Sequence, residues 1–290
     1  MNHTLQIPCL DLSQIADSGQ CFRMAPQPDD SYFVISRDRC LKISQRGQEI
    51  VFCCPDSDLD FWLNYFDIST DYQAVFHLAE SGDPYVARAA ACASGIRILR
   101  QEPWEMIITF VISQQKTIPA IRTLVEALSR RYGRSLENPW KIPAFSFPSP
   151  QELSRASLED LQNLKLGYRA KYIHRLCREV LEGRLDLGRL ASLSYEEAMA
   201  CLTGFYGIGK KVANCVCLFG LHHVSAFPVD TWIQKILMEE YYSDARYGKI
   251  PKNRLFDQIL ADHFSRYGQY AGIIQQYIFY YERLRQNRVK

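Results

Sequence analysis

The chain has 290 residues, of which 47% are hydrophobic and 23% charged, and its formal net charge is +2. This is the composition of an ordinary globular protein that is long enough for two or more lobes with sizeable cores. The nearly neutral charge excludes a uniformly basic surface, so a nucleic-acid site would have to be a local patch.

The ten cysteines follow no disulfide or metal-site pattern. They are scattered, their closest pairs are Cys53–Cys54 and Cys215–Cys217, and no C-x-x-C spacing occurs. We therefore expect no metal site, no iron–sulfur cluster and no other cofactor. The start of the chain lacks a signal-peptide pattern and no apolar run reaches 18 residues. These features predict a cytoplasmic protein that does not contact membranes, associated with the nucleoid if it is bacterial.

The first part of the chain predicts an antiparallel sheet. Short β-rich runs at 31–36, 40–44 and 49–54 are separated by polar turns, which is typical of a meander. From about residue 56 the pattern becomes helical. We expect an α+β protein with a sheet domain over residues 1–98 and a mostly helical, two-lobed domain over residues 99–290.

The segment 103–133 begins as a nearly all-apolar helix, a pattern that predicts a central position in a core. The pattern breaks at 113–117 and resumes with apolar residues at helical spacing. Further along the chain, capping boxes at Ser149–Glu152 and Ser194–Glu197 each predict the start of a helix.

After Ser194 the sequence predicts two helices joined by a glycine turn, a helix–hairpin–helix. Gly207 and Gly209 permit a positive φ and expose backbone N–H groups where the second helix begins at Lys210. These amides are suited to hold a phosphate. The pattern alone fits equally well a hairpin that needs glycine only to make its turn.

Lys211 and Cys215 are four residues apart on the second helix and therefore share one face. Asp230 directly precedes a further amphipathic helix, where it is expected to be the N-cap and therefore a well-oriented carboxylate. An isolated lysine is most often a solvated surface charge. A reactive Lys211 is favoured here by its combination with Asp230.

The stretch "YGIGKKVANC" followed by "PVD" resembles the helix–hairpin–helix and aspartate motif of base-excision DNA glycosylases. Within that superfamily the chain resembles the 8-oxoguanine DNA glycosylase family, and the resemblance runs nearly from end to end. "SGQCFR" (18–23) is similar to the family's N-terminal pocket strand, "LGYRAKY" (166–172) to a second family motif, and "YAGIIQQYIFYY" (270–281) to the C-terminal pocket helix. The resemblance implies a monomeric DNA glycosylase with lyase activity, whose partner is double-stranded DNA containing 8-oxoguanine.

The resemblance assigns the chemistry to two residues. Lys211 would attack C1′ of the damaged nucleotide, displace the base and form a Schiff base, after which β-elimination cuts the strand. The attacking amine must be neutral. Asp230 would stabilise the positive charge that develops on the sugar and would orient Lys211.

The resemblance also assigns a base pocket. The carbonyl of Gly19 would accept a hydrogen bond from N7–H of 8-oxoguanine and repel the N7 acceptor of guanine. Gln275 would bind the Watson–Crick edge, and Phe279 and Cys215 would lie on the two sides of the base. Considered without the family, each of these residues is more simply explained by helix packing or, for Gly19, by a turn.

On the opposite strand, Arg169 would hydrogen-bond cytosine and Tyr168 would wedge against the base stack. Gln115 stands where the family usually has Asn, and Ala120 where many members have an arginine. The loss of one of two arginine contacts predicts relaxed selectivity for the opposite base. The other expected DNA contacts are Gly207, Gly209, Lys210 and Trp232, and Trp232 replaces a histidine common in eukaryotic members, which indicates a bacterial-type branch.

Other classes fit less well. Alkylated-base glycosylases share the fold without a lysine nucleophile, and the endonuclease III and adenine glycosylase groups carry a C-terminal cysteine cluster that this sequence lacks. A non-catalytic helix–hairpin–helix protein that binds DNA lesions is the alternative from a different class. Such a clamp needs neither Lys211 nor Asp230.

Overall fold

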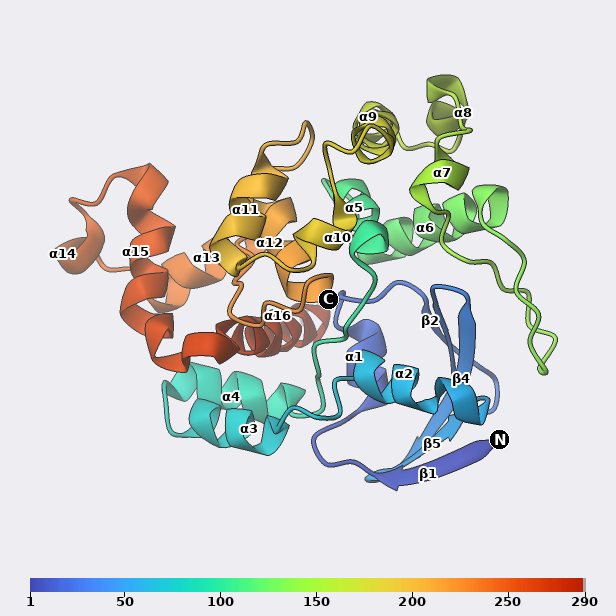
Figure 1. Cartoon of the computed structure of the whole chain (residues 1–290). Coiled ribbons are helices and arrows are strands. Elements are labelled where there is room, and N and C mark those ends of the chain that lie inside the picture. Colours follow the sequence, from blue (N-terminus) through green and yellow to red (C-terminus); the bar gives the residue numbers. More distant parts are fainter. Residues whose placement is uncertain (289–290) are drawn as a thin grey trace.

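The computed structural model describes residues 1–288. Its N-terminal part contains a five-stranded antiparallel sheet with the order β1-β5-β4-β3-β2 (Figure 1). The strands are β1 (Asn2–Gln6), β2 (Met24–Pro26), β3 (Tyr32–Ser36), β4 (Arg39–Arg46) and β5 (Glu49–Cys53). The three predicted strands are confirmed. The two edge strands β1 and β2 were not predicted. β2 ends in Pro26, which has no backbone N–H to donate and is tolerated here because β2 lies at the edge of the sheet.

Two helices, α1 (Leu12–Asp17) and α2 (Leu59–Tyr65), pack on this sheet and close a core of their own around Ile43, Phe52 and Trp62. The next helices along the chain are α3 (Tyr72–Glu80), α4 (Pro84–Ala93), α5 (Pro103–Ile112), α6 (Ile118–Tyr132), α7 (Pro150–Leu153) and α8 (Leu158–Asn163).

The rest of the described chain, from residue 169 onward, is helical. Its helices are α9 (Arg169–Leu181), α10 (Leu187–Leu190), α11 (Tyr195–Thr203), α12 (Lys210–Phe219), α13 (Thr231–Glu240), α14 (Asp244–Tyr247), α15 (Lys252–Phe264) and α16 (Ala271–Arg288). These helices share one hydrophobic core, which we call the helical core. Helices α3 and α4 also belong to the helical core, and α4 packs along α16 (Figure 1). The helical core therefore draws on chain segments from both sides of the domain boundary expected at residue 98.

Helix α5 lies at the centre of the helical core, as its apolar sequence predicts. All of its residues from Trp104 to Ile112 are buried, and it packs against α12, α6 and α9. The expected break follows at Ser113, and Gln115 in the loop before α6 has a positive φ of 53°. Hydrogen bonds from Lys211 to Ser113 and from Arg169 to the carbonyl of Gln114 hold this segment against α12 and α9.

Both predicted capping boxes are formed. The backbone N–H of Ser149 donates to Glu152 at 2.8 Å, and that of Ser194 donates to Glu197 at 2.9 Å. No helix within residues 1–288 combines the length and the apolarity needed to cross a membrane.

Candidate active site

A cavity of about 150 Å³ lies where five separate parts of the chain meet. Its volume is below the range of about 300–1,000 Å³ typical of sites for drug-sized ligands, and suits a single small ring system. The six residues predicted for catalysis and base binding all line it, and they are Gly19, Lys211, Cys215, Asp230, Gln275 and Phe279. The fold thus brings together residues that are up to 260 positions apart in the sequence, from Gly19 to Phe279.

Lys211 is the second residue of α12 and is partly buried, whereas Lys210 before it is exposed. The Nζ of Lys211 donates a hydrogen bond to Ser113 Oγ at 3.3 Å and lies 5.4 Å from the centroid of the Phe110 ring. Ser113 in turn donates its hydroxyl hydrogen to the carbonyl of Phe110 at 2.8 Å. The Ser113 oxygen therefore has its acceptor side available to the amine, and the amine is held at the wall of the cavity.

Asp230 is the N-cap of α13, as predicted. Its Oδ1 accepts a hydrogen bond from the backbone N–H of Ile233 at 2.8 Å. Such a cap fixes the carboxylate at the positive end of the helix dipole. Because Lys211 and Asp230 line the same cavity, a fixed anion and a held amine face one enclosed space.

The Cys215 side chain is 3% exposed and lies one helical turn after Lys211. Burial raises the pKa of its thiol above 9.0, although the nearby Lys211 opposes this shift. Cys215 therefore presents a neutral, polarisable surface to the cavity at neutral pH.

Gly19 adopts a φ of +78°, which favours glycine. A Cβ at this position would lie 3.1 Å from Ile118 Cδ1 and 3.4 Å from Phe279 Cε1, so a side chain would crowd the cavity wall. The segment 18–23 is irregular rather than the strand that the resemblance implied, and the strand β2 begins only at Met24. Gly19 lines the cavity from within this irregular segment.

Two glutamines on α16 lie at the cavity wall. Gln275 donates from Nε2 to the carbonyl of Pro228 at 3.3 Å and accepts at Oε1 from Gln276 Nε2 at 2.8 Å. Gln276 was not predicted from the sequence. Its position three residues before Phe279, one helical turn away, was the available signal. The sequence interpretation also missed Ser113 as a wall residue.

Phe279 packs its ring against Trp232, with 6.0 Å between the ring centroids. Trp232 is partly buried at the start of α13 and therefore supports the wall of the cavity from behind.

The hairpin that precedes α12 depends on Gly207. Its φ is +93°, and a Cβ there would collide with the Tyr172 ring. Gly209 differs from the expectation of a positive φ, because its φ is −90° and it forms the N-cap of α12. A Cβ at Gly209 would meet nothing, so the space beside the first amides of α12 is open. The exposed Lys210 follows directly.

Arg169 connects the start of α9 to the loop between α5 and α6. Its Nε donates to the carbonyl of Gln114 at 2.9 Å, its Nη2 contacts the same oxygen, and Nη1 donates to the carbonyl of Leu166 at 3.3 Å. Its guanidinium lies 4.5 Å from the centroid of the Tyr168 ring, which is largely exposed. The next loop residue, Gln115, is exposed as well. Tyr168 and Gln115 are therefore exposed, whereas Arg169 is only 4% exposed and its guanidinium is engaged by main-chain carbonyls.

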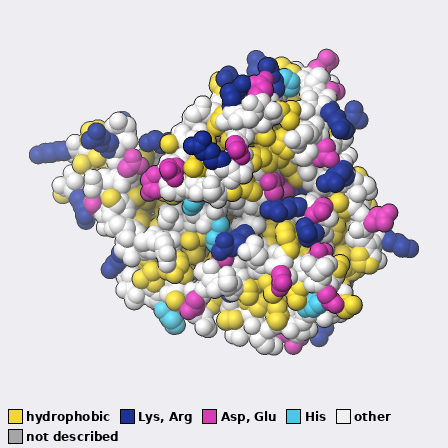
Figure 2. Space-filling model, in the orientation of Figure 1, with side chains coloured by type: hydrophobic (Ala, Val, Ile, Leu, Met, Phe, Trp, Pro, Cys, Tyr) yellow, Lys and Arg dark blue, Asp and Glu magenta, His cyan; other side chains and the backbone are white. Residues whose placement is uncertain are grey.

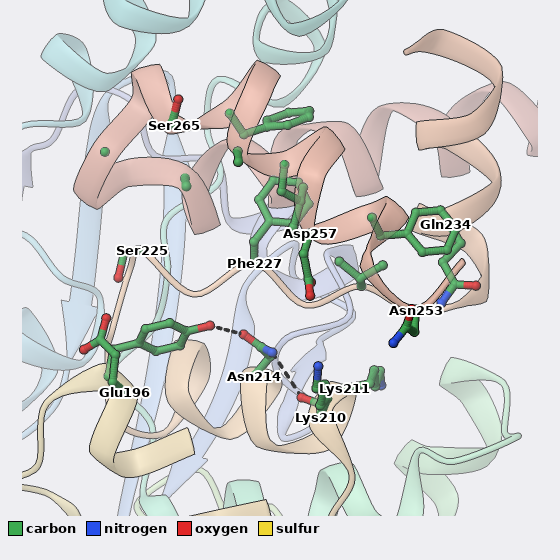
Figure 3. A pocket seen from close by; sticks show the side chains of 18 of the residues that line it. Glu196, Lys210, Lys211, Asn214, Ser225, Phe227, Gln234, Asn253, Asp257 and Ser265 are labelled. Carbon is green, nitrogen blue, oxygen red and sulfur yellow. Dashed lines mark hydrogen bonds between the residues drawn. The ribbon is translucent and has the colours of Figure 1, made fainter. Parts of the chain in front are cut away.

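Lys211 also borders a second, larger groove of about 980 Å³. Figure 3 shows Lys210, Lys211 and Asn214 on one side of this groove, with Phe227 and Asp257 facing them. Asn214 accepts from Tyr195 Oη at 2.7 Å and donates to the carbonyl of Lys210 at 3.1 Å. Lys211 thus borders both the small cavity and the open groove.

Basic side chains on the molecular surface are interspersed with acidic ones on the face seen in Figure 2. This distribution agrees with the low net charge of +2. Among residues 1–288, no group of three or more His, Cys, Asp or Glu side chains is placed to hold a metal ion. All ten cysteines are free thiols.

Two family models match the chain. The model described as the 8-oxoguanine DNA glycosylase N-terminal domain matches residues 4–107, and the model of the HhH-GPD superfamily of base excision DNA repair proteins matches residues 108–259.

The chain is also similar to individual proteins. It is 33% identical to the N-glycosylase/DNA lyase of Saccharomyces cerevisiae over 67% of this chain and 58% of that protein. It is 34% identical to the N-glycosylase/DNA lyase OGG1 of Arabidopsis thaliana over 68% of this chain and 54% of that protein. The chain therefore spans somewhat more than half the length of these two curated relatives.

A solved structure matches over almost the whole chain. The 8-oxoguanine glycosylase/lyase of Clostridium acetobutylicum, in complex with double-stranded DNA containing cytosine opposite 8-oxoguanine, is 30% identical with a TM-score of 0.87, and 99% of this chain and 98% of that chain are covered. Together with the two family matches, this similarity shows that the chain belongs to the 8-oxoguanine DNA glycosylase family of the helix–hairpin–helix superfamily.

Proposed function

We propose that this protein is a bifunctional DNA glycosylase/lyase of base excision repair, which removes 8-oxoguanine from duplex DNA and then cleaves the strand. The observation that carries the proposal is the convergence of Lys211 and Asp230 with the predicted base-binding residues on one cavity. The printed names of the relatives, N-glycosylase/DNA lyase and 8-oxoguanine glycosylase/lyase, support the same reaction.

The reaction begins when the damaged nucleotide is flipped out of the duplex and its base enters the cavity. The neutral amine of Lys211 attacks C1′ while the glycosidic bond breaks, and the base leaves with the bonding electrons and gains a proton. The sugar ring then opens to give a Schiff base between Lys211 and C1′. Loss of a proton from C2′ eliminates the 3′ phosphate and cuts the strand.

Asp230 acts on the positive charge that grows on the sugar as the base departs. Its carboxylate is held by the N–H of Ile233 at 2.8 Å, so it need not reorganise during the reaction. Ser113 holds Lys211 at the same cavity wall through the 3.3 Å hydrogen bond.

The base is selected by hydrogen-bonding chemistry. The main chain at Gly19 reaches the cavity wall without a side chain in the way, so its carbonyl can accept a hydrogen bond from N7–H of 8-oxoguanine and repel the unprotonated N7 of guanine. The amide of Gln275 provides both a donor and an acceptor for the Watson–Crick edge, and the Phe279 ring provides a stacking surface.

DNA outside the cavity is held by the hairpin and by the surface around Arg169. The open amides beside Gly209 and the exposed Lys210 suit a backbone phosphate. Tyr168 is exposed and suited to wedge against bases, whereas Arg169 must release main-chain carbonyls before it can contact cytosine. With Ala120 in place of a second arginine, we propose relaxed selectivity for the opposite base. We also propose that the protein acts as a monomer, in which one chain supplies all six predicted catalytic and base-binding residues.

The test is a cleavage assay on end-labelled duplexes that contain 8-oxoguanine or guanine opposite cytosine. The proposal expects cleavage only at 8-oxoguanine, with a 3′ unsaturated aldehyde on the upstream fragment. Binding of the 8-oxoguanine duplex without base release or cleavage would instead favour the non-catalytic lesion-binding protein.

A further inference from the structure

The cavity wall contains a glutamine to which the family resemblance assigns no role. Gln276 is 4% exposed, follows Gln275 on α16 and lines the cavity that Lys211 borders. Its Nε2 donates to Gln275 Oε1 at 2.8 Å. The two amides are therefore coupled, and the orientation of Gln276 is set by its neighbour.

The Oε1 atom of Gln276 is buried and has no hydrogen-bond partner within residues 1–288. Several other buried polar atoms share this state, but among them only this oxygen belongs to a residue that lines the cavity. A buried acceptor without a donor is unfavourable. This oxygen is closed off from solvent although its residue lines the cavity, so a rotation of the Gln276 amide towards the cavity would let a donor on the ligand satisfy it.

The hydrogen-bonding capacity of Gln275 is already partly used. One of its Nε2 hydrogens goes to the carbonyl of Pro228, and one acceptor position of its Oε1 is taken by Gln276. A primary amide has two donor hydrogens and two acceptor positions, so Gln275 retains one of each. Gln276 Oε1, by contrast, has both of its acceptor positions free within residues 1–288.

We propose that Gln276 is a second base-reading residue, whose Oε1 accepts a hydrogen bond from an N–H group on the Watson–Crick edge of the flipped-out purine. The inference rests on the proposed function, because it assigns a substrate contact within the same cavity. A guanine-type base carries N–H donors at N1 and at its 2-amino group, whereas an adenine-type base has an acceptor at N1, no amino group at C2 and its N–H donor at the 6-amino group instead. Gln276 Oε1 therefore favours 8-oxoguanine over 8-oxoadenine, although both present N7–H to Gly19.

The experiment compares wild type with Gln276→Leu in single-turnover assays on three duplexes, which carry 8-oxoguanine, 8-oxoadenine or an abasic site opposite cytosine. We expect the variant to excise 8-oxoguanine about tenfold more slowly, the effect of one lost buried hydrogen bond. Its cleavage at the abasic site should be unchanged, because no base occupies the cavity there. Its excision of 8-oxoadenine should be unchanged or faster, so the preference between the two bases falls.

A matched control is available on the same helix. Tyr277 is the next residue, its buried hydroxyl also has no partner within residues 1–288, and it does not line the cavity. Tyr277→Phe should leave excision of 8-oxoguanine and the preference between the two bases as in wild type.

A second variant separates direct contact from an effect through Gln275. If Gln276 only orients Gln275, then Gln276→Leu will have no further effect in a Gln275→Leu protein, and that result would overturn the proposal. A direct contact predicts an additional loss of 8-oxoguanine excision in the double variant. If Gln276→Leu slowed the reaction equally on all three duplexes, or on none of them, the base-reading role of Gln276 would also be overturned, while the proposed function would stay intact. Failure of wild type to excise 8-oxoguanine would remove the proposed function as well.

Discussion

The Nζ of Lys211 lies 3.3 Å from Ser113 Oγ, which joins the start of α12 to the end of the central helix α5. The Ser113 hydroxyl hydrogen is committed to the carbonyl of Phe110, so its oxygen can accept from Lys211 in a fixed direction. The Lys211 amine is thus positioned by the C-cap residue of α5, a helix whose residues from Trp104 to Ile112 are all buried.

Removing this hydrogen bond should slow the reaction without unfolding the protein. We expect Ser113→Ala to lower the single-turnover rate on an abasic-site duplex about tenfold, because small misplacements of a nucleophile are costly. Ser129→Ala is the matched control, since Ser129 is buried and donates to the Val125 carbonyl but does not line the cavity. Equal rates for Ser113→Ala and wild type would show that Ser113 does not position Lys211.

The two hairpin glycines should respond differently to the same substitution. We expect Gly207→Ala to lower the free energy of unfolding by about 2 kcal/mol or more, because its positive φ disfavours alanine and the new methyl group meets Tyr172. Gly209→Ala should change stability by less than about 1 kcal/mol. It should instead weaken duplex binding, since the methyl group occupies the open space beside the α12 amides.

Urea unfolding and duplex affinity measured on both variants check this pair. A stable Gly207→Ala protein would contradict the account of the hairpin. Unchanged duplex affinity of Gly209→Ala would contradict the phosphate site.

Selectivity for the opposite base should be adjustable at position 120. Relaxed selectivity predicts that wild type prefers cytosine over adenine by less than several hundredfold. Ala120→Arg should raise this preference about tenfold to a hundredfold, the range expected for one good base contact. Ala120→Gln lacks the guanidinium and is the control, so it should not raise the preference for cytosine. The measurement is excision of 8-oxoguanine opposite each of the four bases.

The stability of the protein should depend on pH through Glu105 on α5. Burial raises the pKa of this carboxyl from 4.5 to about 7, with Arg23 opposing the shift and Glu102 adding to it. Below pH 4.5 the group is protonated in both the folded and the unfolded chain. As pH rises towards 7, the unfolded chain releases the proton first, so the free energy of unfolding falls.

In wild type, the free energy of unfolding should fall by on the order of 3 kcal/mol as pH rises from the unfolded-state pKa of Glu105 to its folded-state pKa. Glu105→Gln should remove this fall. Urea unfolding of wild type and variant at pH values below 4.5 and above 7 measures this change in the free energy of unfolding. An equal decline in wild type and variant would show that another group is responsible.

Much of the fold follows from local sequence patterns. Alternation predicted β3, β4 and β5, continuous apolarity predicted α5, and side-chain chemistry predicted the caps at Ser149 and Ser194. The edge strand β1 was missed because its sequence, NHTLQ, is mostly polar and none of its residues is buried, and β2 because it has only three residues.

Residues of the cavity could be predicted where reactive side-chain types occur within a recognisable sequence motif. Lys211 and Asp230 belong to one motif, and the fold places both at the cavity. Ser113 and Gln276 could not be assigned from the sequence, because their importance depends on which side chains tertiary packing brings beside them. For the same reason the sequence could not reveal that Arg169 is engaged by the carbonyl of Gln114.

The central claim is that Lys211 forms a covalent bond with the damaged nucleotide. The most direct measurement is incubation with an 8-oxoguanine:cytosine duplex in the presence of sodium borohydride, which reduces a Schiff base to a stable amine. We expect a trapped protein–DNA complex with wild type and none with Lys211→Gln. Tight binding of the duplex by wild type without any trapped complex would contradict it and would identify the protein as a lesion-binding clamp.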